Sequence, residues 1–343
     1  MSPRRPSPDR APNQIDVARA AGVSAQTVSR VLSGHPNVRP ETARRVHAAI
    51  ESLGYRIHAA AASLASGRTR ILGMILVSND RYSSAALGAG VESAAAANGY
   101  TVTTAAVADH ASTSAFLEAF DRLERQGAEG IILNVPVELD SPAMGARTQR
   151  TPTIRSELAS MQPDAPLIVD QHAIGRLAVE HLLDLGHRTV WHVGGDEYWI
   201  EGRHRREAWE QVLGERGIVP PPVIPGEWTP ESGYRAGRTI AAIPDATAVF
   251  AASDEMAFGL IRALHEAGRR VPEDISVVSV DDIALAAYAS PALTTVRQPF
   301  EDMGRAAALR LISHIEESDA DEAVPDLHPE LIIRSSTAPP RGQ

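Results

Sequence analysis

The sequence predicts a small all-α head of three helices followed by a larger α/β region of doubly wound, mostly parallel sheets. Three observations support this fold class. Residues 15–34 read as two short amphipathic helices joined through Gly22 and Val23. From residue 71 onward, apolar runs of strand length alternate with amphipathic runs of helix length. Arginine dominates the charge at the start of the chain, whereas acidic residues dominate the remainder.

The first helix is predicted from its cap and its apolar stripe. Asn13 is a suitable N-cap, and Val17, Ala18 and Ala21 recur at helical spacing. Gly22 can adopt the left-handed conformation that ends a helix. The chain can therefore turn sharply into a second helix.

The second helix is predicted to begin after a Ser24 cap and to bury Val28, Val31 and Leu32. In a helix-turn-helix, the outward side of this element enters the DNA major groove. The candidate DNA contacts are Ser24, Ala25, Gln26, Thr27, Ser29 and Arg30. Glutamine and arginine side chains pair with adenine and guanine edges. The alternative is a pair of ordinary packing helices with a polar outer face.

A third helix is predicted over residues 40–53, with Pro40 and Glu41 in its first turn, and it completes the head.

The distribution of charge along the chain favours the DNA-binding alternative. The first 70 residues contain 11 arginines and 4 acidic residues, whereas the remaining 273 contain 22 arginines and 39 acidic residues. The net charges are therefore +7 and −17, although the whole chain is acidic at −10. A basic head on an acidic body is typical of a phosphate-binding module attached to a larger domain.

The composition narrows the class of protein further. Hydrophobic residues make up 43% of the 343 residues, enough for a sizeable core in two or three domains. The absence of cysteine excludes disulfides and thiolate metal sites. No apolar run approaches the roughly 20 residues that span a bilayer, and the start of the chain lacks a signal-peptide apolar region. We therefore expect a cytoplasmic protein with no membrane partner.

The larger region is predicted to be α/β because strands and helices alternate in it. The expected strands are residues 71–77, 100–107, 130–134, 167–169, 189–193, 248–251 and 276–280. Amphipathic segments at 114–126 and 175–185 separate some of them. About 270 residues exceed one usual doubly wound domain, so two lobes are expected. Ligands of such sheets bind at the carboxyl ends of the strands.

No motif in the chain indicates catalysis. Gly194 and Gly195 follow an expected strand, but no phosphate-binding G-K-[ST] or G-x-G-x-x-G pattern accompanies them, so a tight turn is favoured. The 12 histidines show no H-E-x-x-H or other metal-ligand spacing, and G-x-S-x-G is absent. We expect no enzymatic activity, no cofactor and no metal.

The head resembles that of one family closely. It reads D-V-A-R-A-A-G-V-S-A-Q-T-V-S-R-V-L-S-G, then N-V-R-P-E-T-A-R-R-V and L-G-Y. The segments D-I-S-V-V-S-V-D-D and P-A-L-T-T-V-R-Q-P extend the similarity towards the C-terminus. The chain is identified on these motifs as a member of the lac repressor (LacI/GalR) family of bacterial transcription regulators. That resemblance implies two lobes like those of periplasmic sugar-binding proteins, with an effector in the cleft between them.

The expected domain boundaries follow from the motifs and the resemblance. Residues 1–12 form a flexible tail, 13–56 the helix-turn-helix domain and 57–70 a hinge helix and linker. Residues 71–335 form the effector-binding and dimerisation domain. Lobe 1 covers about 71–168 and 299–327, and lobe 2 covers about 169–298 and 328–335.

The hinge departs from the pattern of the family. Resemblance implies that a short helix here folds on operator DNA and inserts Leu64 into the minor groove as an apolar wedge. Ile57, His58 and Ala62 stand where the family usually has proline, asparagine and arginine. The alternative is a plain alanine-rich linker, since so short a helix is unstable alone.

The resemblance places two charged effector contacts in lobe 2. The family's effector-contacting arginine matches Arg203, whereas Arg205 and Arg206 are expected to be solvated helix charges. The family's hydroxyl-binding aspartate matches Asp281, directly after an expected strand.

Four further effector contacts are expected, some with alternatives. Ser253 is an expected contact, while Asp254 is expected to cap the next helix instead. Trp228 offers a flat apolar platform for a sugar ring, whereas the other tryptophans suit the core. Gln298 and Glu157 align with further contacts, the latter within one or two positions.

Together these features predict a homodimeric transcriptional regulator, most simply a repressor of sugar-utilisation genes, that reads a near-palindromic operator. A small sugar, a galactoside or an oligosaccharide, is expected to control operator affinity from the cleft. The alternatives are a regulator that responds to a purine or another non-sugar corepressor, and a sugar-binding transport protein. The basic head argues against the transport protein.

Overall fold

The computed structural model describes residues 12–32, 37–55, 67–77, 81–108, 110–135, 141–155, 170–318 and 327–341. The chain divides into two compact units, Met1–Thr69 and Arg70–Gln343. Within the described residues, no helix combines the length and the apolar character needed to cross a membrane.

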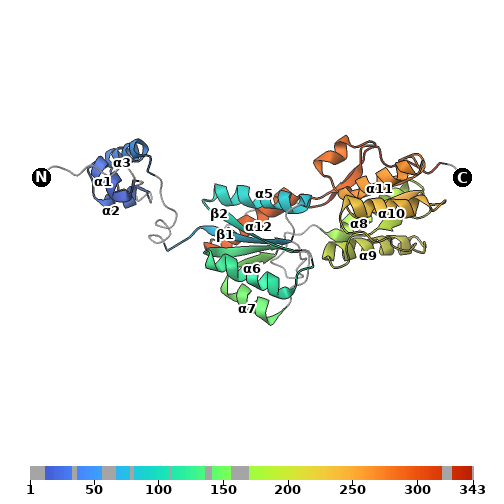
Figure 1. Ribbon diagram of the computed structural model, residues 1–343, viewed down its shortest axis with the longest axis horizontal. Helices are drawn as coiled ribbons and strands as arrows, with labels where there is room; N and C mark the ends of the chain where they lie inside the picture. The colour runs from blue at the N-terminus through green and yellow to red at the C-terminus, as the bar shows by residue number, and fades with distance from the viewer. Residues whose placement is uncertain are drawn as a thin grey trace. The chain divides into compact units, whose positions relative to one another are not determined.

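The head is a three-helix unit of α1 (Gln14–Ala21), α2 (Ala25–Leu32) and α3 (Pro40–Leu53), as Figure 1 shows. Asn13 and Asp16 form a capping box at the start of α1, and Gly22 ends that helix with a φ of 64°. Val17, Val28 and Val46 are fully buried between the helices. The predicted head is therefore confirmed.

The first lobe contains the four-stranded parallel sheet A, in the order β2-β1-β3-β4. Its strands are β1 (Ile71–Val77), β2 (Thr101–Val107), β3 (Ala128–Asn134) and β4 (Thr153–Arg155). Helices α5 (Tyr82–Ala97) and α12 (Phe300–Ile315) cover one face, and α6 (Thr113–Arg125) and α7 (Pro142–Arg150) lie on the other (Figure 1). Six of the seven residues of β1 are buried because helices cover both faces.

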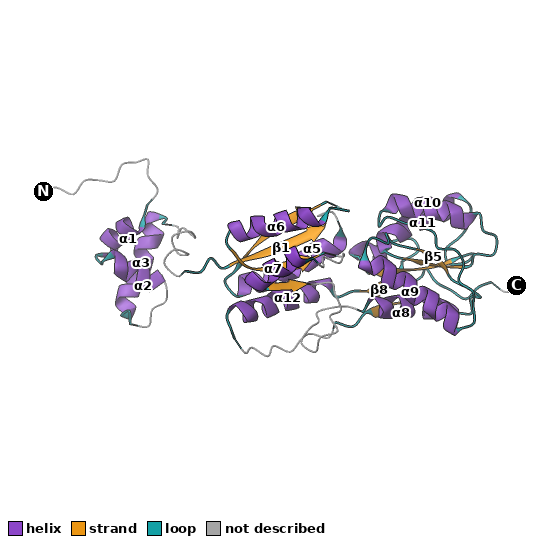
Figure 2. Ribbon diagram, turned by 90° about the horizontal axis from the view of Figure 1, so that it is seen from below, coloured by secondary structure: helices purple, strands orange, loops and turns teal. Residues whose placement is uncertain are grey.

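The second lobe contains the five-stranded sheet B, in the order β5-β6-β7-β8-β9. Its strands are β5 (Trp191–Val193), β6 (Ala248–Ala251), β7 (Ser276–Asp281), β8 (Thr294–Arg297) and the antiparallel edge strand β9 (Glu330–Ile332). Helices α8 (Gln171–Asp184) and α9 (Ile200–Glu215) lie on one face, and α10 (Pro230–Ala241) and α11 (Asp254–Glu266) lie on the other (Figure 2). A short 3-10 helix, η1 (Ala284–Tyr288), follows β7.

The predicted α/β class with parallel sheets is confirmed, with three strands added. The expected strands 71–77 and 248–251 match β1 and β6, and four others differ only at their ends. Strands β4, β8 and β9 were not predicted because they are only three or four residues long. The expected strand at 167–169 lies outside the described residues.

The two lobes are interleaved along the chain. The chain passes between the sheets after β4, after β8 and again after α12. Each lobe is therefore completed by residues far apart in the sequence, and the carboxyl ends of several strands face a common cleft.

Candidate functional site

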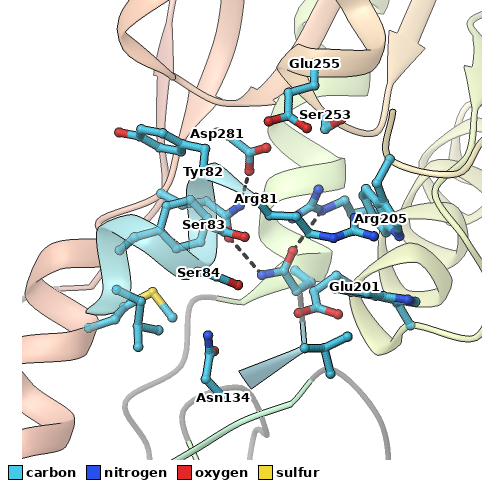
Figure 3. A pocket seen from close by; sticks show the side chains of 18 residues that line it. Arg81, Tyr82, Ser83, Ser84, Asn134, Glu201, Arg205, Ser253, Glu255 and Asp281 are labelled. Carbon is cyan, nitrogen blue, oxygen red and sulfur yellow. Dashed lines mark hydrogen bonds between the residues drawn. The ribbon is translucent and has the colours of Figure 1, made fainter. Parts of the chain in front are cut away.

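A cleft lies at the carboxyl ends of strands from both sheets. Val77 and Asn134, at the ends of β1 and β3, line it from the first lobe together with the start of α5. Ser253, Asp281 and the residues around β8 line it from the second lobe. This is where open parallel sheets bind ligands. Figure 3 shows the polar side chains of both lobes turned towards the same space.

A chain of hydrogen bonds runs along the second-lobe wall of the cleft (Figure 3). The Gln298 amide donates to Asp281 at 2.7 Å and accepts a bond from Gln171 at 3.0 Å. The Gln171 carbonyl oxygen in turn accepts from Nε of Arg205 at 2.9 Å. Arg205 also donates to the backbone carbonyl of Ala252. One connected network therefore fixes four polar side chains before any ligand arrives.

Burial shifts the protonation of the charged cleft residues. Loss of hydration raises the pKa of Asp281 to about 8, although the guanidinium of Arg205 opposes this shift. Burial also raises the pKa of Glu201, against the attraction of Arg205 and Arg81. The pKa of Arg205 is lowered, again by burial. A ligand that donates hydrogen bonds to these carboxyls would favour their ionised forms.

Two tryptophans form the apolar walls. The rings of Trp199 and Trp228 lie 5.9 Å apart at an interplanar angle of 52°. The guanidinium of Arg81 lies 4.2 Å above the Trp199 ring, and that of Arg205 lies 5.5 Å from Trp228. The residue facing the Trp228 ring is Gly195, where any Cβ would overlap the ring. Gly195 therefore makes room for a tryptophan rather than for a phosphate.

Several buried polar atoms in the described part of the chain have no hydrogen-bond partner. Nε1 of Trp228 and Oε2 of Glu201 are among them, and both residues line the cleft. Buried polar groups without partners are uncommon and costly, because their hydration is lost without replacement. The indole N–H of Trp228 is a donor, and the Glu201 carboxyl accepts when ionised and can donate when protonated. Both groups are available to a ligand or to ordered water in the space that they line.

Side chains from the two lobes meet beside the start of α9. Nε2 of His110 lies 2.8 Å from the Asp196 carboxylate, and the Tyr198 hydroxyl donates to the carbonyl of Ala111 at 3.2 Å. The rings of His110 and Tyr198 lie 4.8 Å apart. Residues 110 and 111 follow β2 of the first lobe, whereas 196 and 198 follow β5 of the second. These contacts, called the interlobe latch below, connect the two lobes.

The structure corrects the expectations for the arginines of α9. Arg205 is 4% exposed and lines the cleft, so the expectation that it is a solvated charge was wrong. Arg203 is absent from the lining, and its guanidinium donates to the backbone carbonyls of Glu197 and Tyr198. Positions 201 and 205 are four residues apart and share the cleft face of the helix, from which 203 is turned away.

The cap expected at Asp254 is supplied by its neighbour. Ser253 lines the cleft, and its hydroxyl caps α11 by accepting the N–H of Met256. The fully buried Asp254 carboxylate instead accepts from Ser279, from Thr295 and from the backbone N–H of Ile283. The expectation of an Asp254 cap was wrong, because this side chain connects α11 to β7 and β8.

Most of the other expected effector contacts line the cleft. Asp281, Trp228 and Gln298 line it together with Ser253. Glu157 lies outside the described residues, as do Leu64 and the other hinge positions.

Sequence reasoning missed part of the cleft lining. The missed residues include Arg81, Asn134, Gln171, Trp199, Glu201 and Glu255. The four-residue spacing of Glu201 and Arg205 was a usable signal for two neighbours on one helix face. The first-lobe residues gave no such signal, since only the fold brings β1, β3 and α5 to the cleft.

The expected DNA-reading residues lie on the outer side of the head. Ala25, Gln26 and Arg30 are exposed, while the buried Val28 faces the head core. Ser24 accepts the backbone N–H of Thr27 at 3.1 Å, so it caps α2 as predicted. Thr27 and Ser29 are half-buried.

Comparisons with known proteins agree with this arrangement. Residues 15–57 match the family "Bacterial regulatory proteins, lacI family", and residues 179–337 match the "Periplasmic binding protein-like domain" family. The HTH-type transcriptional repressor PurR of Pectobacterium carotovorum subsp. carotovorum is 34% identical, covering 94% of this chain and 96% of its own. The lac repressor dimer bound to operator and the anti-inducer ONPF superimposes with a TM-score of 0.86 at 29% identity, covering 96% and 100% of the two chains.

A third similar protein, in the structure of the transcriptional regulator CelR–cellobiose complex, has a TM-score of 0.68 and 30% identity, covering 95% and 99% of the two chains. Thus the basic three-helix head, the two interleaved lobes and the similarity over almost the whole chain agree. The chain belongs to the LacI family of DNA-binding transcriptional regulators.

Proposed function

We propose that this regulator is a homodimeric repressor whose operator affinity is controlled by a neutral sugar bound in the cleft. The observation that supports a polyhydroxylated ligand most directly is the pair of buried atoms without partners, Nε1 of Trp228 and Oε2 of Glu201. A hydroxyl group both donates and accepts, so neighbouring hydroxyls on one ring can bond to both atoms.

The charge and shape of the cleft argue for the same ligand class. Two arginines, Arg81 and Arg205, stand against three carboxyl groups, Glu201, Glu255 and Asp281. The net charge of this set is −1 when all three carboxyls are ionised, and +1 when burial keeps Asp281 and Glu201 protonated. Neither state carries the excess of positive charge that would favour a strongly anionic ligand. The two tryptophan rings are tilted by 52°, so they do not form the parallel slot that would hold a planar purine between them. Two tilted apolar walls suit the C–H faces of a sugar, including an oligosaccharide.

The ligand class is tested by thermal denaturation of the full-length protein with mono- and disaccharides and with purine bases and nucleosides. A ligand at 100 times its Kd stabilises the folded state by about 2.7 kcal/mol, because it binds only that state. We expect stabilisation by a sugar but not by a purine. Stabilisation by purines alone would establish the corepressor alternative.

The DNA side of the proposal rests on the outer side of α2. Gln26 and Arg30 are exposed there and can form paired bonds with base edges. We expect Gln26→Ala to cost about 1–3 kcal/mol at particular operator bases while random DNA is bound as before. Equal weakening on both DNAs would contradict base reading. Leu64 remains the proposed minor-groove wedge, and measurement of operator bending by a Leu64→Ala protein tests that role.

An exposed apolar site in the second lobe supports the homodimer. Leu285 and Tyr288 of η1 are 56% and 85% exposed, which is unusual for large apolar side chains. A self-complementary face would bury both side chains in a two-fold pair and would align two heads with a near-palindrome. Sedimentation of a Tyr288→Asp protein tests this, with a shift towards monomer expected.

A further inference from the structure

Three potential metal ligands converge on the outer surface of α8 and α9, beside the cleft. They are His172 on α8 and the pair His204 and Glu207 on α9. The two imidazole rings are stacked, with centroids 4.7 Å apart and an interplanar angle of 26°. Nε2 of His172 lies 3.6 Å from a carboxylate oxygen of Glu207. One ligand atom from each residue lies within 4.8 Å of the other two.

The packing of the two helices holds this arrangement in place. His204 and Glu207 are three residues apart, so they share one helix face. Gly175, one turn after His172, lets α8 approach α9 closely, since a Cβ at this position would lie 2.7 Å from Cβ of Ala208. The first turn of α8 is fixed by Asp170, whose carboxylate accepts the backbone N–H of His172 at 2.8 Å. The backbones that carry the three ligands are therefore well defined.

The donor set selects a class of cation. A tetrahedral ion with ligands at about 2.0–2.1 Å needs donor atoms roughly 3.3 Å apart, within reach of small side-chain rotations from the observed spacing. Two imidazoles and one carboxylate suit zinc and neighbouring transition metals rather than calcium or magnesium, which prefer all-oxygen sites. The side chains of His172 and Glu207 are 45% and 49% exposed, so ions and water can reach the site.

We propose that His172, His204 and Glu207 bind one zinc-type divalent cation, with water in the fourth position. Spacing along the chain did not indicate this site because its ligands come from two helices.

The site adjoins the polar network of the cleft. His172 follows Gln171 in the sequence, and His204 precedes Arg205. Gln171 and Arg205 are joined by the 2.9 Å hydrogen bond described above. A cation bound by both helices therefore restrains the backbone on both sides of that bond, and it increases the affinity of the cleft for its ligand. This coupling rests on the proposed function of the cleft, whereas cation binding itself does not.

Calorimetric titration of zinc into metal-free full-length protein tests the site. We expect one site per chain in the native protein, and a loss of affinity of more than about tenfold in His172→Ala and in His204→Ala. His265→Ala is the matched control, since His265 is an exposed histidine on α11 of the same lobe. Cobalt(II) should give tetrahedral ligand-field absorption bands in the native protein and in the control, but not in His204→Ala.

Two results would overturn the proposal: native zinc affinity and stoichiometry in His204→Ala, or zinc binding that is equally lost in His265→Ala. Melting of each variant in the presence of a chelator checks that it folds. Melting with and without zinc, at a fixed concentration of a cleft sugar, tests the coupling separately. Zinc binding without a change in sugar-induced stabilisation would remove the coupling and leave the metal site standing.

Discussion

Arg205 was expected to be a solvated charge, and its position in the cleft changes the interpretation of the site more than that of any other residue. Its guanidinium bonds to Gln171 and to the carbonyl of Ala252 and lies beside Trp228, so one side chain contacts three parts of the cleft. Burial lowers its pKa, yet a guanidinium stays charged at any physiological pH. It is therefore a permanent positive charge in the wall of the cleft.

We predict that Arg205→Ala weakens ligand binding by about 2–4 kcal/mol, because a buried charge-assisted contact is lost and the nearby carboxyls lose their counter-charge. Operator binding by the ligand-free protein should persist, because the DNA-reading residues lie in the other unit. Calorimetry measures the first effect and gel mobility the second. Arg203→Ala is the control, and an equal loss of ligand affinity in that protein would restore the original assignment.

Asp281 gives the cleft a pH dependence of predictable sign. Its pKa is raised to about 8 without ligand, and hydroxyl groups that donate to the carboxylate lower it. Binding therefore releases a proton, and ligand affinity should rise with pH up to about 8 and then level off. Calorimetry in two buffers of different ionisation enthalpy counts the released proton. Asp281→Asn should abolish this slope, and a slope that survives in this variant would assign the proton to another group.

Among the elements, helices and long strands were predicted better than short strands and clefts. Residues 40–53 were predicted from Pro40 and Glu41 in the first turn, and α3 has those bounds. Strand β8 is the sequence T-T-V-R, with two buried threonines that bond to Asp254 and to the C-terminal segment. Its burial depends on partners 40 and 41 residues away along the chain, so no local pattern indicates it. Cleft-lining residues were predicted only where family motifs identified them. Glu201 could be assigned to the cleft only once the helix α9 and its orientation were known.

The cap of α1 provides a test at the level of one element. We predict that Asn13→Ala destabilises the head by about 1 kcal/mol, because two backbone N–H groups lose their acceptor. Hydrogen exchange of α1 measures this, with faster exchange expected in the head alone. Ser112→Ala is the control, since Ser112 occupies the N-cap of α6 without accepting a cap hydrogen bond. Equal acceleration in α6 of the control would show that the cap bond is not the cause.

For the molecule as a whole, the interlobe latch is one of the contacts that a change of lobe angle must alter. The His110 side chain is 58% exposed, so its pairing with Asp196 is worth no more than about 1 kcal/mol. Even so, a latch beside the ligand-binding cleft affects how quickly that cleft opens.

We predict that Asp196→Asn speeds ligand dissociation by a factor of about two to five, which corresponds to about 0.4–1 kcal/mol. Stopped-flow fluorescence of the cleft tryptophans measures this rate. Glu210→Gln, on the outer side of α9, is the control and should leave the rate unchanged. His110→Ala should match Asp196→Asn, and the double variant should add little. Additive effects would show that the two side chains act separately.

The Gln171–Gln298 hydrogen bond joins two of the three places where the chain passes between the lobes, since Gln298 follows β8 and Gln171 begins α8. If the lobes rotate about these crossings, a ligand in the cleft would lie where the rotation produces its smallest displacement. Discrimination between two lobe angles must then come from the direction of a few hydrogen bonds rather than from a large change in contact area. Two cleft ligands that differ only in the orientation of one hydroxyl group would consequently be able to stabilise opposite lobe angles.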